Sequence, residues 1–357
     1  MKPRLSVATL VAVLGISALA ACGSDNGEDS SDRTTVTGHS DTAATHETLD
    51  DGIDAGNGSE PGSREGSGSS ASEGEWPRTV SLGKTEVTIE EAPHRIVAVS
   101  AETAEIALLL VGAERIVAVP ARAQGDHSTS DELASQVGQV LPPGTDPDPE
   151  LILSMEPDLV LNTARHGGEE TAGDQLEQAG VPVLNIDPDA FATPEKVAET
   201  ARALGAALGE EELAEQLSAE FRSDIEELDS QREDTDARFL VLMARRDTVM
   251  AMDDSLMLPG LITRANATNA GERIGLTTTR PIDAEQIVAA NPDVIFLEDF
   301  QGMGEESFAE LLDNPALASV PAVGEDRIFV IPMSEASGIS GLNTAEGYRK
   351  IIETLAG

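Results

Sequence analysis

The sequence predicts an α/β protein with two parallel-sheet lobes joined by a single long helix. Three observations support this prediction. Short apolar runs alternate with helical segments, one segment pattern occurs twice, and a long amphipathic helix separates its two copies. Apolar runs that alternate with helices are typical of parallel sheets, whose strands are buried on both faces.

The first apolar runs follow each other closely. Residues 95–100 and 115–120 predict two buried strands, and residues 103–111 predict an apolar helix between them that ends before Gly112. This strand–helix–strand order is the basic unit of a parallel sheet.

The repeated pattern begins with a glutamate. Glu150 is followed seven residues later by a Pro-Asp pair and an apolar run, and Glu285 is followed by the same arrangement. Each copy predicts a short helix, a break and a buried strand. Because the copies lie about 135 residues apart, they indicate two similar lobes.

The segment between the copies is helical by pattern. Thr193 and Pro194 suit the N-cap and the first position of one helix. A second helix is predicted from Glu210 to about Ser230, because its apolar residues recur at helical spacing. At 1.5 Å per residue this helix spans roughly 30 Å, which is enough to join two lobes.

The N-terminus has the pattern of a secretory signal. Lys2 and Arg4 precede an apolar run at residues 5–18 that is too short to span a bilayer. Small residues then lead to Cys22, the only cysteine, so no internal disulfide forms. Its position resembles the bacterial lipoprotein signal, which implies a lipidated protein on the extracytoplasmic side of the cell membrane. The alternative is a cysteine in a signal that is discarded.

The predicted chain organisation has five parts. A lipoprotein signal at 1–22 is followed by a flexible acidic linker at 23–78, rich in glycine and serine, in which His39 and His46 are expected to be solvated. An N-terminal lobe at 79–192, a helical segment at 193–232 and a C-terminal lobe at 233–357 complete the chain.

Composition excludes several functions. With 23 basic and 65 acidic residues, the chain has a formal charge of −42, which argues against nucleic acid as a partner and against a basic face on anionic lipid. The lipid on Cys22 is therefore the only expected membrane attachment. No phosphate-binding loop, zinc-protease motif or cysteine nucleophile is present outside the signal, so the sequence predicts no enzyme and no intrinsic cofactor.

A family resemblance follows from the order of several motifs. PHRIVAVS at 93–100, TAEI at 103–106 and Gly112-Ala113 are similar to the opening of the iron-complex and cobalamin substrate-binding proteins of ABC importers. NP at 314–315, VPAV at 320–323 and RIFVI at 327–331 resemble the C-terminal lobe of that family. The resemblance implies a ligand held in a cleft between the lobes, small closure, and delivery to a membrane permease with its ATPase. A surface lipoprotein that senses or stores a ligand without an importer is the alternative.

The resemblance assigns a role to the two repeated glutamates. Glu150 and Glu285 align with the glutamates that meet arginines on the permease. Asp283 and Gln286 suit a capping box that would place Glu285 in an exposed first turn. The alternative is a first-turn carboxylate that only stabilises its helix.

Candidate ligand-binding residues follow the predicted strands, because open α/β sheets bind ligands beyond the carboxyl ends of their strands. Arginines there suit carboxylate or catecholate groups of a ligand, although surface ion pairs are the alternative. The candidates are Arg122, His127, Arg165, His166, Arg245, Arg246, Met303 and Met333.

The resemblance also bears on the identity of the ligand. Haem binders of this family place an axial Tyr or His just before the first docking glutamate, but residues 138–146 contain neither. Tyr348, the only tyrosine, is expected to pack in the C-terminal helix. A ferric siderophore is therefore the favoured ligand, whereas haem bound through His127 or His166 and cobalamin remain open, and no metal ligand is assigned.

Overall fold

The first lobe is built on a parallel sheet of five strands in the order β5-β4-β3-β6-β7. The computed structural model describes residues 76–82, 85–125, 128, 130–245, 248–300 and 302–357. Predictions on the signal, Cys22, most of the linker, His127 and Arg246 fall outside these residues. The five strands are β3 (Ile96–Ala98), β4 (Ile116–Pro120), β5 (Gln139–Leu141), β6 (Leu159–Thr163) and β7 (Val183–Ile186).

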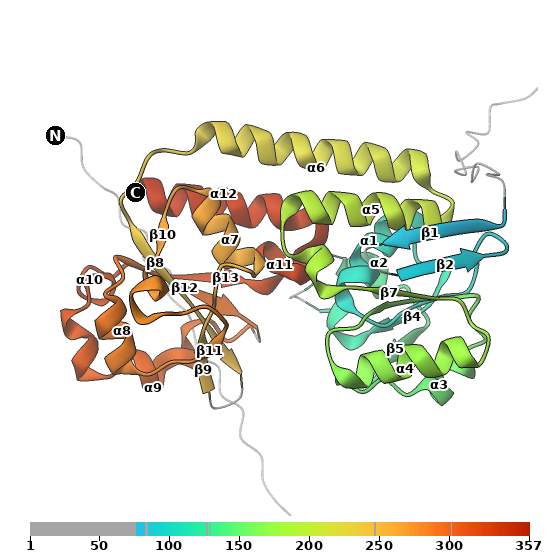
Figure 1. Cartoon of the computed structure of the whole chain (residues 1–357), viewed down its shortest axis with the longest axis horizontal. Coiled ribbons are helices and arrows are strands. Elements are labelled where there is room, and N and C mark those ends of the chain that lie inside the picture. The colour runs from blue at the N-terminus through green and yellow to red at the C-terminus, as the bar shows by residue number, and fades with distance from the viewer. Residues whose placement is uncertain (1–75, 83–84, 126–127, 129, 246–247, 301) are drawn as a thin grey trace, which may run out of the picture. The chain divides into compact units, whose positions relative to one another are not determined.

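Helices cover both faces of this sheet (Figure 1). One face packs against α1 and α5, and the other buries Ile152 and Leu176 of α3 and α4. Because β3, β4, β6 and β7 are buried on both sides, they are apolar at nearly every position, whereas the edge strand β5 leaves Gln139 and Val140 exposed. The helical elements of this lobe are α1 (Ala101–Val111), η1 (Ala121–Ala123), α2 (Asp131–Ala134), α3 (Pro149–Leu153), α4 (Gly167–Gln178) and η2 (Pro188–Phe191).

An antiparallel hairpin precedes the first lobe. Its strands are β1 (Arg78–Leu82) and β2 (Thr85–Ile89), paired from Arg78 opposite Ile89 to Leu82 opposite Thr85. β1 packs against α5 and β2 packs against β7, so the hairpin lies on the side of the lobe.

Two helices follow each other along the chain between the lobes, and the second one joins them. In α5 (Pro194–Leu208), the Thr193 hydroxyl accepts a hydrogen bond from the Lys196 N–H at 3.4 Å, which confirms the predicted cap. Gly209 has a φ of 78° and turns the chain into α6 (Glu211–Gln231). Helix α6 packs on α5 beside the first lobe and on α12 beside the second, so it spans both lobes as predicted (Figure 1).

The sheet of the second lobe is mixed. Its main path is β11-β9-β8-β12-β13, with β10 paired to β8. β8, β10, β12 and β13 are parallel, whereas β9 and β11 pair antiparallel to their neighbours. The strands are β8 (Arg238–Arg245), β9 (Thr248–Ala251), β10 (Thr268–Asn269), β11 (Arg280–Pro281), β12 (Val294–Asp299) and β13 (Ile328–Pro332).

Helices again lie on both faces of this second sheet. One face packs against α7 and α12, and the other packs against α8, η4, η5 and α10. The helical elements are α7 (Met257–Arg264), η3 (Ala270–Ile274), α8 (Ala284–Ala290), η4 (Gly304–Phe308), α9 (Ala309–Leu312), η5 (Pro315–Ser319) and α10 (Pro321–Gly324).

The C-terminal segment returns to the first lobe. After β13 come α11 (Met333–Ala336), η6 (Gly338–Asn343) and α12 (Thr344–Ala356), and η6 packs against α1. At Gly341, which has a φ of 51°, a Cβ would lie 3.1 Å from the Glu105 side chain. A glycine is needed there for both its φ and its close contact.

The structure confirms the predicted fold class, with one difference in the second sheet. The prediction of a parallel sheet holds throughout the first lobe, but in the second lobe the antiparallel strands β9 and β11 extend the parallel strands. Only two residues separate β8 from β9, and a connection this short can join only antiparallel strands.

Candidate ligand-binding site

Three predicted arginines lie just beyond the carboxyl ends of strands from both lobes. Arg122 follows β4, Arg165 follows β6, and Arg245 ends β8. The lobes meet here, because the Arg122 guanidinium donates a hydrogen bond to the Phe300 carbonyl oxygen just after β12, at 3.3 Å. The structure therefore brings these residues together where α/β proteins bind ligands.

The aromatic ring of Phe300 is shared by two of these arginines. The guanidinium carbon of Arg122 lies 3.9 Å from the ring centroid, and that of Arg245 lies 5.8 Å away. Burial lowers the pKa of Arg122 below its usual range, and the positive charge of Arg245 lowers it further. Within the described part of the chain, neither arginine forms an ion pair with a carboxylate.

Arg165 has a different environment. Its guanidinium forms an ion pair with Glu102 of α1, and its backbone N–H donates to the Glu169 carboxylate at 2.9 Å. Burial lowers the pKa of Arg165, and Arg245 adds to this effect, whereas Glu169 and Glu298 oppose it. Arg165 therefore contributes less free positive charge to the site than Arg122 and Arg245 do.

Besides Glu102, two further buried carboxyl groups lie beside the arginines or on α1. Glu298 of β12 is 3% exposed, and burial raises its pKa to about 7, although Arg245 and Arg165 oppose the rise. Glu105 of α1 is 6% exposed, and burial raises its pKa to about 8 against a hydrogen bond with Ser130. Both groups are thus unusually easy to protonate near neutral pH.

The remaining candidates have more peripheral positions. His166 is the N-cap of α4, where its backbone N–H and its Nδ1 both contact the Glu169 carboxylate, at 2.8 and 3.2 Å. Met303 is exposed at the start of η4, and Met333 begins α11. Among the described residues, no three His, Cys, Asp or Glu side chains come together to hold a metal ion.

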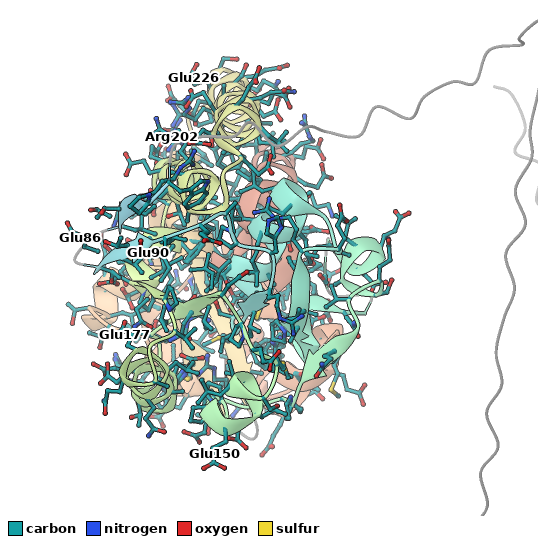
Figure 2. The ribbon with its side chains drawn as sticks, turned by 90° about the vertical axis from the view of Figure 1, so that its right-hand side faces the viewer. Glu86, Glu90, Glu150, Glu177, Arg202 and Glu226 are labelled. Atoms are coloured by element: carbon teal, nitrogen blue, oxygen red, sulfur yellow. The ribbon has the colours of Figure 1, made fainter. Side chains whose placement is uncertain are left out.

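The two repeated glutamates occupy equivalent positions on the two lobes. Glu150 is exposed in the first turn of α3, where Asp148 caps the helix by accepting the N–H of Glu150 at 2.9 Å. Glu285 is exposed in the first turn of α8, where Asp283 and Gln286 form the predicted capping box. Figure 2 shows Glu150 pointing away from the body of the protein.

Sequence reasoning missed three residues of the site. Phe300 follows β12, where the sequence predicts a ligand contact only from Met303. Glu102 and Glu105 are charged residues three apart in an otherwise apolar helix, and both are buried. Charged residues on the apolar face of a buried helix were the signal that would have pointed to them, because buried charges require a partner or a function.

Together, the fold and the site define a two-lobed solute-binding protein. The chain belongs to the periplasmic binding protein family, whose model matches residues 96–335. Membership of this family places the protein on the extracytoplasmic side of the membrane. Among the described residues, no helix is long and apolar enough to cross a bilayer. No curated protein matches the chain.

Several solved structures share this fold. The periplasmic haem-binding protein RhuT of Roseiflexus sp. RS-1, in its apo form, is 25% identical, with a TM-score of 0.62 over 73% of this chain and 97% of that one. A possible iron-binding protein of Staphylococcus epidermidis is 17% identical, with a TM-score of 0.60 over 75% of this chain and 100% of that one. The haem-binding protein BhuT, in complex with two haems, is 23% identical, with a TM-score of 0.63 over 73% and 97%.

Proposed function

We propose that this protein is the solute-binding component of an ABC importer and captures a negatively charged iron complex. The observation that carries the proposal is the position of Arg122 and Arg245. These two guanidinium groups come from different lobes and share one aromatic ring, and neither has a carboxylate partner among the described residues.

An anionic ligand would relieve the repulsion between these two arginines. Two positive charges that share a partly buried position repel each other more strongly than they would in water. Carboxylate or catecholate oxygens would accept charge-assisted hydrogen bonds from the planar guanidinium groups. In a chain with a formal charge of −42, such a cluster of cations is a local exception that favours an anion.

The iron complex is the more specific part of the proposal. RhuT, the neighbour with 25% identity, is named as a haem-binding protein, which supports an iron-containing ligand and favours haem as a second candidate. We favour a ferric siderophore, because residues 138–146 lack the Tyr or His that haem binders of the resembled family place there. His166 keeps its Nε2 available for haem iron if its Nδ1–H donates to Glu169.

Delivery would use the two exposed glutamates. Glu150 and Glu285 stand in capped first turns on separate lobes, so both can meet arginines on a permease without a change in the lobes. A surface hollow lined by Pro147, Pro149 and Thr171 lies next to Glu150 and offers space for a partner side chain. The permease and its ATPase are therefore the partners we propose.

Anchoring would depend on Cys22. A lipid on this residue would hold the folded lobes at the membrane through the acidic linker. Membrane fractionation of Cys22→Ser tests this part of the proposal, which fails if the variant still requires detergent for release.

A calorimetric titration panel tests the ligand class. The panel contains an iron(III) tris-catecholate siderophore, a neutral ferric trihydroxamate, haemin and cobalamin. We expect the anionic siderophore to bind most tightly. If haemin binds most tightly and gives an intense Soret band that shifts in His166→Ala, the ligand is haem and not a siderophore. Tightest binding of the neutral hydroxamate or of cobalamin would contradict the anionic-ligand proposal.

A further inference from the structure

Glu298 is a carboxyl group enclosed by the ligand-binding site. It lies in β12 with Met243 of β8 on one side and Ile331 of β13 on the other, and it is 3% exposed. Within the described part of the chain, its carboxyl group forms no hydrogen bond and no ion pair. A buried carboxylate in such a position is costly unless nearby positive charge or a proton compensates it.

The charged groups around Glu298 come from both lobes. Arg245 on β8 and Arg165 after β6 are the two cations that act on it. Arg165 is already paired with Glu102 and contacts Glu169 through its backbone. Arg122 lies against the ring of Phe300 and is not among the charges that shift the pKa of Glu298.

The other elements packed on β12 contribute little charge at this position. β13 and α10 contain no titratable residue, and Glu305 and Glu306 of η4 are exposed. Asp299, the next residue of β12, accepts the backbone N–H groups of Gly302, Met303 and Gly304. The ionisation of Glu298 therefore depends mainly on how much of the positive charge of the arginines reaches it.

We infer that Glu298 is a specificity-determining residue of the ligand site, which takes up a proton when an anionic ligand binds to the arginines and so favours anionic over neutral ligands. This inference rests on the proposed function and adds the means by which the site responds to ligand charge.

Ligand binding and protonation of Glu298 are thermodynamically linked. Without ligand, burial raises the pKa of Glu298 to about 7 while Arg245 and Arg165 hold it down. A bound anion neutralises part of that positive charge and adds repulsion, so the pKa of Glu298 rises further and a proton is taken up. Affinity for an anion should then increase as pH falls through the range above neutrality, by at most about tenfold per pH unit for one proton. Below the pKa of the free protein, the gain levels off, since Glu298 is protonated before the ligand arrives.

Glu105 is the competing source of such a proton. Burial raises its pKa to about 8, but it faces Ser130 and lies against Gly341 rather than the arginine cluster. A substitution at Glu298 alone separates the two carboxyl groups. Glutamine keeps the shape of the side chain and resembles the protonated acid.

The experiment measures proton uptake by the full chain on binding an iron(III) tris-catecholate. Calorimetry at about pH 7.5 in two buffers of different ionisation enthalpy gives the number of protons, and titrations from about pH 6 to 8.5 give the affinity. We expect the wild type to take up a substantial fraction of one proton and to bind several-fold more tightly per unit fall in pH. Glu298→Gln should take up none and show a flat profile. Glu305→Gln, which removes an exposed carboxylate from η4, is the control and should behave as the wild type.

Each of the other outcomes contradicts the inference, and each one contradicts a different step of it. Binding by the wild type without proton uptake leaves the proposed function intact but removes the role of Glu298. Uptake that persists in a folded Glu298→Gln, as checked by thermal unfolding, assigns the proton elsewhere, with Glu105 as the first alternative. Equal uptake with a neutral ferric trihydroxamate contradicts the link to ligand charge. If no iron complex binds, the proposed function itself fails.

Discussion

The guanidinium groups of Arg122 and Arg245 both lie near the ring of Phe300, and neither forms an ion pair with a carboxylate among the described residues. A cation over an aromatic face contributes about 0.5–1 kcal/mol at an exposed site and about 2 when desolvated. The guanidinium carbon of Arg122 lies 3.9 Å from the ring centroid and that of Arg245 lies 5.8 Å away, so the ring holds Arg245 less closely than Arg122. Arg245 is therefore able to turn towards a ligand at the smaller cost.

This arrangement predicts the effect of removing either arginine. Arg122→Ala or Arg245→Ala should weaken binding of an anionic iron complex by about ten- to a hundredfold, because a charge-assisted hydrogen bond contributes roughly 1.5–3 kcal/mol. Moderate salt should weaken wild-type binding in part, since charges in a partly buried site are incompletely screened. Arg202→Ala on α5 (Figure 2) is the matched control and should leave affinity unchanged. If both site variants bind the ligand as tightly as the wild type does, the two arginines do not bind the ligand.

The positions of Arg122, Arg165 and Arg245 at strand ends were predictable, because basic residues after apolar runs are conspicuous in an acidic chain. Their role in ligand binding stays a prediction. Phe300 was not predicted, because a sequence does not show that an aromatic residue after one strand will contact an arginine of the other lobe.

The C-terminal end of α6 is fixed by hydrogen bonds to neighbouring helices. Asp229 accepts from the Arg264 guanidinium of α7 at 2.7 and 2.9 Å and from the Tyr348 hydroxyl of α12 at 2.8 Å. Arg264 also pairs with Glu195 of α5 at 2.5 Å. Burial disfavours ionised Asp229, but the bonds from Arg264 and Tyr348 outweigh it and lower its pKa. These contacts hold the C-terminal end of α6 against α7 and α12, and the pair of Arg264 with Glu195 ties α7 to α5.

We expect Tyr348→Phe to lower the free energy of unfolding by about 1–2 kcal/mol, because it removes one hydrogen bond to a charged group while Arg264 keeps Asp229 paired. The side chain is fully buried, so phenylalanine keeps the packing. Urea unfolding followed by far-ultraviolet circular dichroism measures the change. The surface pair of Glu346 and Arg349 on the same helix provides a control, since Arg349→Ala should cost less than about 0.5 kcal/mol. A loss in Tyr348→Phe no larger than that of the control would contradict the role of this contact.

Elements with a local signal were predicted well. The caps at Thr193 and Asp283 and the helical spacing of α6 depend on neighbours along the chain, and the structure has all three. The return of η6 to α1 and the antiparallel strands of the second sheet depend on contacts between distant residues, for which a single sequence carries no local pattern.

At the scale of the whole molecule, the two lobes share an apolar core. A single cluster of buried residues includes Ile96 of the first sheet, Phe239 of the second sheet and Phe221 of α6. Because packed cores are stiff, this continuity favours a small closure of the lobes on a ligand. A stiff body keeps the exposed Glu150 and Glu285 at a fixed separation, which would suit the permease docking that we propose for them.

If Glu150 and Glu285 dock onto the permease, replacing them should impair transport of the ligand without weakening its binding. Replacing Glu150 or Glu285 by arginine should impair uptake of the iron complex by cells that carry the importer, and the double variant should abolish it. Affinity for the ligand should stay within about threefold, a free-energy change of less than about 0.7 kcal/mol, because both side chains are exposed in the first turns of their helices. Glu305→Arg serves as a charge-reversal control. Loss of ligand binding in parallel with uptake would show that these glutamates belong to the ligand site.

We propose that arginines, and not a protein ligand to the metal, hold the iron complex between the lobes. An anomalous difference map, collected at the iron absorption edge from crystals grown with the tris-catecholate complex, would locate the iron and test this proposal. We expect one iron peak beyond the ends of β4, β6, β8 and β12, with ligand oxygens in hydrogen-bond contact with Arg122 and Arg245 and no protein atom coordinated to iron. Iron coordinated by His127 or His166, or an iron peak located away from these strand ends, would contradict the proposal that arginines hold the complex.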